Sequence, residues 1–102
     1  MSMILTGMLD LDSHDVSEIH GGNTSTFTQV NFPTPFPAGS QVVVIPMVQT
    51  FNGPDTPGVR IADVTATGFR IRLNELVAEG KSVAAGGGHH TKERVAWLAT
   101  TV

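Results

Sequence analysis

The chain contains no cysteine and no tyrosine, and only 15% of its 102 residues are charged. Without cysteine, neither disulfides nor thiolate metal sites contribute to the fold. The formal net charge is -3, and no basic stripe with interleaved aromatic residues occurs, which argues against nucleic acid as a partner. The opening stretch MSMILTGMLDLDSHD has no basic segment and only a short apolar run, so it predicts neither a signal peptide nor membrane insertion. We therefore expect a cytoplasmic protein or a component of a virion or similar particle.

Signatures of catalysis are also missing. There is no cysteine nucleophile, no Gly-x-Ser-x-Gly elbow and no glycine-rich phosphate-binding loop before a helix. A glycosidase needs two carboxylates opposed across a cleft, and a short sandwich sheet offers no groove for Glu75 and Glu93. We expect a protein that is not an enzyme and that needs no cofactor.

The sequence does contain a series of short runs in which apolar and polar residues alternate. Clusters of Gly, Pro, Asn and Thr separate these runs at about ten-residue spacing, which is typical of β-sandwiches and barrels. A chain of 102 residues makes a single domain, 1–102. We predict an all-β fold, a six-stranded antiparallel β-sandwich. Its strands are expected over residues 3–11 (interrupted at Gly7), 26–32, 41–50, 59–64, 69–76 and 94–100.

Three segments carry more detailed expectations. Pro46 removes one ladder donor from the apolar run QVVVIPMVQT, so that strand lies at a sheet edge or bulges there. The run PTPFPAG predicts an extended connector, and residues 77–90 predict a long loop that is mobile over residues 84–88. An amphipathic helix over TKERVAWLAT is the alternative to the last strand, which the alternation of Val95, Trp97 and Ala99 favours.

The alternation also predicts which side chains are buried. Phe69 and Ile71 should point to one face of their strand, whereas Arg70, Arg72 and Asn74 should point to the other. The candidate core residues are Phe32, Val42, Val44, Phe69, Val95 and Trp97.

The order of these segments resembles the H-type lectin family. The residues that carry the resemblance are ILTGMLD, QVNFPTPFPAGSQVVVIPMVQT, VRIADVTATGF and RVAWLA. The resemblance implies a six-stranded antiparallel sandwich that assembles as a trimer or hexamer and binds N-acetylgalactosamine- or galactose-type glycans of cell surfaces. The string VRIADVTATGFRIRLNE, followed by a loop and H-T-x-E-x-V, is closer to bacterial and phage-encoded relatives of this sandwich, which occur in surface and tail-fibre-like proteins.

The sugar contacts of that family do not carry over intact. The family's acidic residue falls at Gly22 or Asn23, neither of which is a carboxylate, and Arg60 lies about four residues nearer the Val-Thr turn than the family's arginine. The family's aromatic and histidine contacts fall at Leu76 and Val77. The candidate ligand-binding residues of this chain are Asn23, Asp55, Arg60, Glu75, His89 and His90.

Three readings remain open for a polar cluster that would combine arginines with carboxylates. The cluster would contain Arg60, Arg70, Glu75, His90 and Glu93. It could be a set of exposed ion pairs, an intersubunit network around a trimer axis, or a carbohydrate site. Arg72 is expected on the same strand face as Arg70. The arginine-rich strands favour assembly.

Metal binding has little support in the sequence. Adjacent histidines in a strand point to opposite faces, so only one of His89 and His90 could join Glu93. Asp10, Asp12 and Asp15 lack the calcium-loop pattern. We expect no metal site. Two functions remain: an oligomeric carbohydrate-binding module, or a structural trimerising tip or knob of a phage fibre or similar particle without a small ligand.

Overall fold

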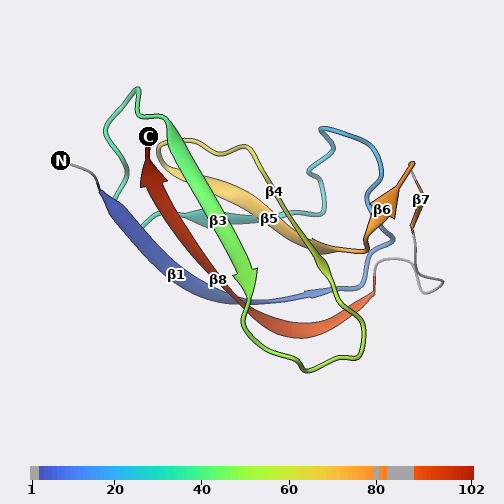
Figure 1. Ribbon diagram of the computed structural model, residues 1–102. Helices are drawn as coiled ribbons and strands as arrows, with labels where there is room; N and C mark the ends of the chain where they lie inside the picture. The colour runs from blue at the N-terminus through green and yellow to red at the C-terminus, as the bar shows by residue number, and fades with distance from the viewer. Residues whose placement is uncertain (1–2, 80, 83–88) are drawn as a thin grey trace.

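The computed structural model describes residues 3–79, 81–82 and 89–102, and this part of the chain is built from strands without a helix (Figure 1). The strands are β1 (Ile4–Ser13), β2 (Thr28–Asn31), β3 (Val42–Val48), β4 (Gly58–Ala62), β5 (Gly68–Asn74), β6 (Val77–Ala78), β7 (Lys81–Ser82) and β8 (His90–Thr101). The prediction of an all-β antiparallel fold is confirmed. The helical alternative for TKERVAWLAT is wrong, because these residues lie in β8.

Six of these strands form two three-stranded antiparallel sheets, in the orders β1-β8-β3 and β2-β5-β4. They correspond to the six predicted strands. β1 runs without interruption through Gly7, whose register partner is Trp97. β3 pairs only with β8, so Pro46 lies on an edge strand, as predicted. An edge strand tolerates proline because no strand on its outer side needs the missing N–H.

β6 and β7 pair with each other as a small hairpin inside the segment predicted to be a loop. The predicted mobility of residues 84–88 lies outside the described residues.

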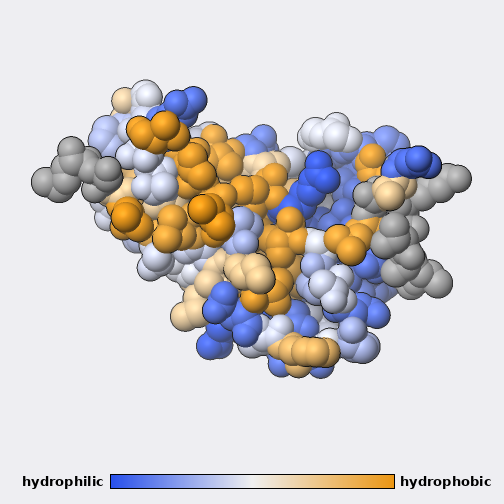
Figure 2. Space-filling view, in the orientation of Figure 1, coloured by the Kyte–Doolittle hydropathy of each residue, from blue (hydrophilic) through white to orange (hydrophobic). Residues whose placement is uncertain are grey.

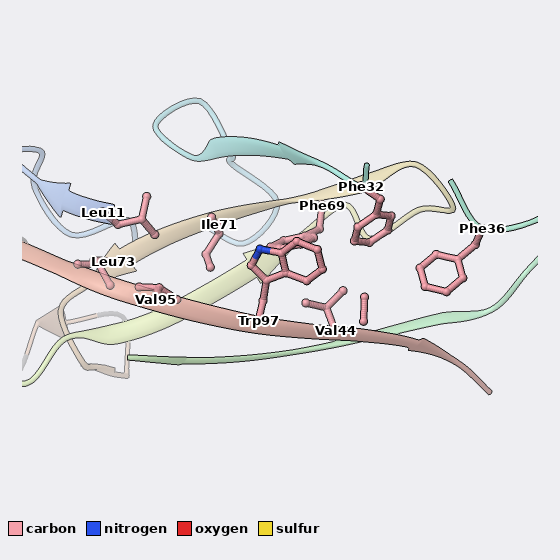
Figure 3. Packing of buried hydrophobic residues seen from close by; sticks show 10 residues of the cluster. Leu11, Phe32, Phe36, Val44, Phe69, Ile71, Leu73, Val95 and Trp97 are labelled. Carbon is pink, nitrogen blue, oxygen red and sulfur yellow. The ribbon is translucent and has the colours of Figure 1, made fainter. Parts of the chain in front are cut away.

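The core lies between the two sheets, where inward side chains of both meet (Figure 3). The Trp97 ring from β8 lies 5.5 Å from the Phe69 ring of β5 and 5.5 Å from the Phe32 ring, measured between centroids. Five of the six predicted core residues are buried, and Val42 packs at the margin of the core, partly exposed. Burial of such side chains contributes roughly 1.5–3 kcal/mol each.

The core also contains an aromatic residue that strand alternation did not predict. Phe36, in the connector PTPFPAG, is only 3% exposed and packs edge-on against Phe32 at 5.3 Å. Its N–H donates to the carbonyl of Ala66 at 2.8 Å. The three prolines therefore hold an extended segment that places an aromatic ring at one end of the core.

The second face of β5 is buried as well, which corrects the expectation that Arg72 and Asn74 point to the surface. Arg72 is 4% exposed and Asn74 is 5% exposed. The segment 14–27 lies over this face of the sheet. Arg72 donates to the carbonyls of Val16 and Asp15 and to the hydroxyl of Thr26, so its guanidinium holds this covering segment on the sheet.

Candidate functional site

A polar hollow of about 190 Å³ lies where the segment 18–27 meets β4 and β5. Its lining combines one carboxylate, one guanidinium, two amides, one imidazole and one aromatic ring. These groups belong to Glu18, Arg60, Asn23, Asn74, His20 and Phe27. We call this feature the polar hollow.

Glu18 organises one wall of the polar hollow. Its Oε1 accepts a hydrogen bond from the N–H of His20 at 2.8 Å, and its Oε2 accepts one from Nδ2 of Asn23 at 2.7 Å. The main chain of Glu18 is fixed to β5, because its N–H donates to Asn74 Oδ1 at 2.9 Å and its carbonyl accepts from Asn74 Nδ2 at 3.1 Å. The carboxylate is therefore held in one position, with lone pairs to spare for a ligand.

Arg60 also lines the polar hollow. It lies on β4 directly opposite Arg72 of β5, and the two side chains behave differently. Arg72 is turned into the covering segment, whereas Arg60 is exposed. None of the hydrogen bonds or ion pairs found between described residues involves the Arg60 guanidinium. Its N–H donors are consequently available to a ligand in the hollow.

The structure brings together only some of the predicted ligand-binding residues. Asn23 and Arg60 share the polar hollow. His89 is exposed, with its ring 6.3 Å from that of His14. Asp55 is exposed in the loop between β3 and β4. These two lie outside the polar hollow.

Glu75 and His90 are buried rather than presented to solvent. Each is 5% exposed, and His90 Nε2 lies 3.7 Å from Glu75 Oε2. No hydrogen-bond partner of that nitrogen is found among the described residues. The pair ties the end of β5 to the start of β8, and its burial excludes direct contact with a ligand on the surface in this structure.

Only part of the possible cluster of arginines and carboxylates is assembled. Among the described residues Glu75 contacts His90, whereas neither Arg60 nor Arg70 forms an ion pair with Glu75 or Glu93. Arg70 lies 3.7 Å from Asp63 and donates to the hydroxyl of Thr24 at 3.1 Å. Glu93 is engaged elsewhere, on the loop that follows β3. Inward and outward positions along the strands, together with the covering segment 14–27, separate these groups into different environments.

Glu93 is the best-satisfied carboxylate among the described residues. It is 3% exposed and accepts hydrogen bonds from the Thr50 hydroxyl at 2.6 Å, the Gly53 N–H at 2.9 Å and the Asn52 N–H at 3.0 Å. The hydrogen bond from Thr50, followed by those from Gly53 and Asn52, lowers the pKa of Glu93 below its ordinary value of 4.5 against the opposing effect of burial, with a smaller contribution from the charge of His90. Glu93 therefore anchors the loop as a carboxylate.

Sequence reasoning missed Glu18, Asn74 and Phe27 as neighbours of Asn23. One signal was present, because Glu18 is the only acidic residue between positions 16 and 27. The resemblance to H-type lectins places the family's carboxylate at position 22 or 23, where this chain has Gly22 and Asn23. The fold of the loop, which no periodicity describes, brings a carboxylate from five residues earlier to the same hollow.

Among the described residues, no group of three or more His, Asp or Glu side chains is arranged to hold a metal ion. The same part of the chain contains no helix long and apolar enough to cross a membrane. Comparison of the chain with protein-family models, with curated proteins and with solved structures finds no match. The resemblance to H-type lectins therefore stays a prediction.

Proposed function

We propose that this protein is a carbohydrate-binding module, similar to H-type lectins, that takes a terminal galactose- or N-acetylgalactosamine-type sugar in the polar hollow. The observation that carries the proposal is the convergence of Glu18, Asn23 and Arg60 on one hollow. Carboxylates and arginines bind vicinal hydroxyl groups through charge-assisted hydrogen bonds, and this hollow presents one of each with an amide between them.

Glu18 and Arg60 would make complementary hydrogen bonds to a sugar. The Glu18 carboxylate accepts from sugar hydroxyls, and the planar fork of Arg60 donates to oxygen atoms on neighbouring carbons. Phe27 and Ile19 supply apolar surface for the C–H face of a sugar ring, and Ile19 is 46% exposed. Because Glu18 is already fixed by His20 and Asn23, little side-chain entropy is lost when a sugar binds.

A glycan array followed by calorimetry on the best ligand tests the proposal. We expect binding to galactose-type sugars, with Arg60→Met weakening it by at least about tenfold, as the loss of a charge-assisted pair of hydrogen bonds implies. Arg94→Met is the matched control, because it removes the same charge from an exposed side chain on the other sheet. A silent array, or equal affinity in both variants, overturns the proposal.

A second candidate function, assembly into a trimeric or hexameric knob, rests on a different observation. The outer face of the sheet β1-β8-β3 is apolar and exposed. We call it the apolar sheet face; it consists of Ile4, Met8, Val43, Ile45, Met47, Ala96 and Leu98. The exposed fractions reach 67% at Met47, 65% at Met8 and 59% at Ile45. Hydrophobic atoms gather over this region of the molecule in Figure 2.

We propose that a second copy of the chain covers the apolar sheet face. Three strands of about eight residues give a footprint of roughly 400 Å² from standard strand spacings, and apolar patches of about 300–600 Å² on monomers are often functional. Asp10 and Arg94 lie next to one end of the apolar sheet face, 3.3 Å apart, and neutralise each other. An identical face therefore matches it in composition and leaves no charge buried without a partner.

Sedimentation equilibrium tests the second candidate. We expect the wild-type chain to be oligomeric at micromolar concentration and Ile45→Lys to be monomeric. Val16→Lys is the control, because Val16 is 77% exposed and lies off the face. A monomeric wild type, or equal dissociation of both variants, would rule out this face as an interface. An oligomer with a silent glycan array favours the structural knob over the lectin.

A further inference from the structure

A second cavity lies beneath the loop that joins β3 to β4, and it shares no lining residue with the polar hollow. Its volume is about 420 Å³. The loop curls below the sheets in Figure 1. Most of the walls are apolar side chains from β3, β4 and the loop, among them Pro46, Val48, Pro54, Pro57 and Val59. The cavity therefore offers a pocket for an apolar body.

The charged side chains that line this cavity are all negative. Glu93 and Asp55 line it, and no Lys, Arg or His is among its lining residues. Glu93 is 3% exposed and satisfied only by neutral donors, the Thr50 hydroxyl and two loop N–H groups. No ion pair of Glu93 is found within the described ranges. His90, whose charge acts on Glu93, is not among the residues that line the cavity. The Glu93 carboxylate therefore favours positive charge in the space beside it.

An aromatic ring completes the lining. Phe51 is 88% exposed and lines the same cavity. The residues on either side of it, Thr50 and Asn52, both hydrogen-bond to Glu93, so the main chain that carries the ring is fixed. Packing does not account for a phenylalanine at this position. The face of an aromatic ring next to a negatively charged wall attracts organic cations.

We propose that this cavity binds a small organic ammonium ion, with the charged nitrogen toward Glu93 and Asp55, its carbon substituents against the apolar walls, and the ring of Phe51 over the cation. A hard metal ion fits less well, because it needs several oxygen ligands and most of the walls carry none. This site is separate from the polar hollow and does not depend on sugar binding.

An NMR titration with choline and with its uncharged carbon isostere, 3,3-dimethylbutan-1-ol, tests the proposal. The two probes have nearly the same shape and differ in charge. We expect choline to shift the amide signals of Val48, Phe51, Asp55, Val59 and Glu93 along saturable curves. The isostere should bind at least about threefold more weakly, the loss that a partly exposed cation–π contact alone accounts for. Equal binding of the two probes, or shifts that map elsewhere, overturns the proposal.

Two surface variants connect the result to the cavity. Asp55→Asn and Phe51→Leu change exposed side chains, so both proteins should fold, and each should weaken choline binding by about two- to fivefold. Asp12→Asn, which removes an equal charge from an exposed residue of β1, should leave choline binding unchanged. If choline binds all three variants alike, the site is not where we place it.

Discussion

The indole ring of Trp97 lies against Gly7, its register partner on β1. A side-chain carbon placed on Gly7 would come within 2.4 Å of Cζ2 and 2.5 Å of Cε2 of Trp97. Because the ring is also packed between Phe32 and Phe69, it has no free space into which to move. Gly7 therefore sets the position of the largest side chain in the core.

Gly7→Ala should destabilise the protein by about 1–3 kcal/mol, the usual cost of overpacking a core. Urea unfolding followed by tryptophan fluorescence measures the change. Gly21→Ala is the control, because nothing lies within 4 Å of a side-chain carbon at Gly21. Equal stability of the two variants would mean that the indole relaxes freely.

The pairing of Gly7 with Trp97 separates what the sequence could predict from what it could not. The period of two in the strands, and the alternation of Val95, Trp97 and Ala99, correctly predicted an all-β fold and most of its core. The same reasoning treated Gly7 as an interruption, since a glycine within a strand lacks a side chain to pack. The pairing of Gly7 with Trp97 depends on strand register over a separation of 90 residues, which local patterns do not specify.

The burial of Arg72 could not be predicted from the sequence for a similar reason. Alternation correctly placed Arg72 on the opposite face from Ile71, but it could not indicate that the segment 14–27 covers that face. Likewise, Asn23 and Arg60 were predicted as candidates for one site, whereas Glu18 was not. The shape of a loop is set by its tertiary contacts, here the two hydrogen bonds between Glu18 and Asn74.

Arg72→Met should cost about 2–4 kcal/mol of stability, because the buried guanidinium makes several partly buried hydrogen bonds to the segment 14–27 and each hydrogen bond to a charged group contributes about 1.5–3 kcal/mol. Hydrogen exchange should also accelerate across residues 14–26. Arg70→Met is the control on the same strand, where the side chain is 42% exposed and the cost should stay below about 1 kcal/mol. Unchanged exchange in the Arg72 variant would contradict its role in holding this segment.

The pKa of Glu93 predicts a dependence of stability on pH. Its folded pKa is lowered below 4.5, so the unfolded chain binds the proton more readily. The stabilisation is therefore complete above pH 4.5 and is lost as the pH falls through the folded pKa. Glu93→Gln should lower stability at neutral pH and flatten the loss below pH 4.5.

Acid titration of unfolding, followed by circular dichroism, measures this slope. Asp12→Asn serves as the control, because it removes an equal charge from a side chain that is 41% exposed, and it should retain the wild-type slope. If the Glu93 variant loses stability in acid as steeply as the wild type, other carboxylates account for the effect.

Phe36→Ala should destabilise the protein by about 3–5 kcal/mol, as expected for removing a buried phenylalanine. Phe51→Ala is a closely matched comparison, since the same ring is deleted at a position that is 88% exposed, and its cost should lie within about 0.5 kcal/mol. Chemical denaturation of both variants gives the two values. Similar values would mean that the proline-rich connector contributes little to the core.

The pairing of β1 with β8 has a consequence for how the chain folds. The ladder joins Ile4 to Thr100 and Asp10 to Arg94, and β3 reaches its sheet only through β8. The middle strand of this sheet is therefore the last of its three strands to leave the ribosome, and β1 and β3 lack their shared partner until then. Folds dominated by such distant pairings fold in milliseconds to seconds. We expect the apolar strands β1 and β3 to stay exposed until β8 has been synthesised, so that the yield of folded protein depends on chaperones that bind extended apolar segments.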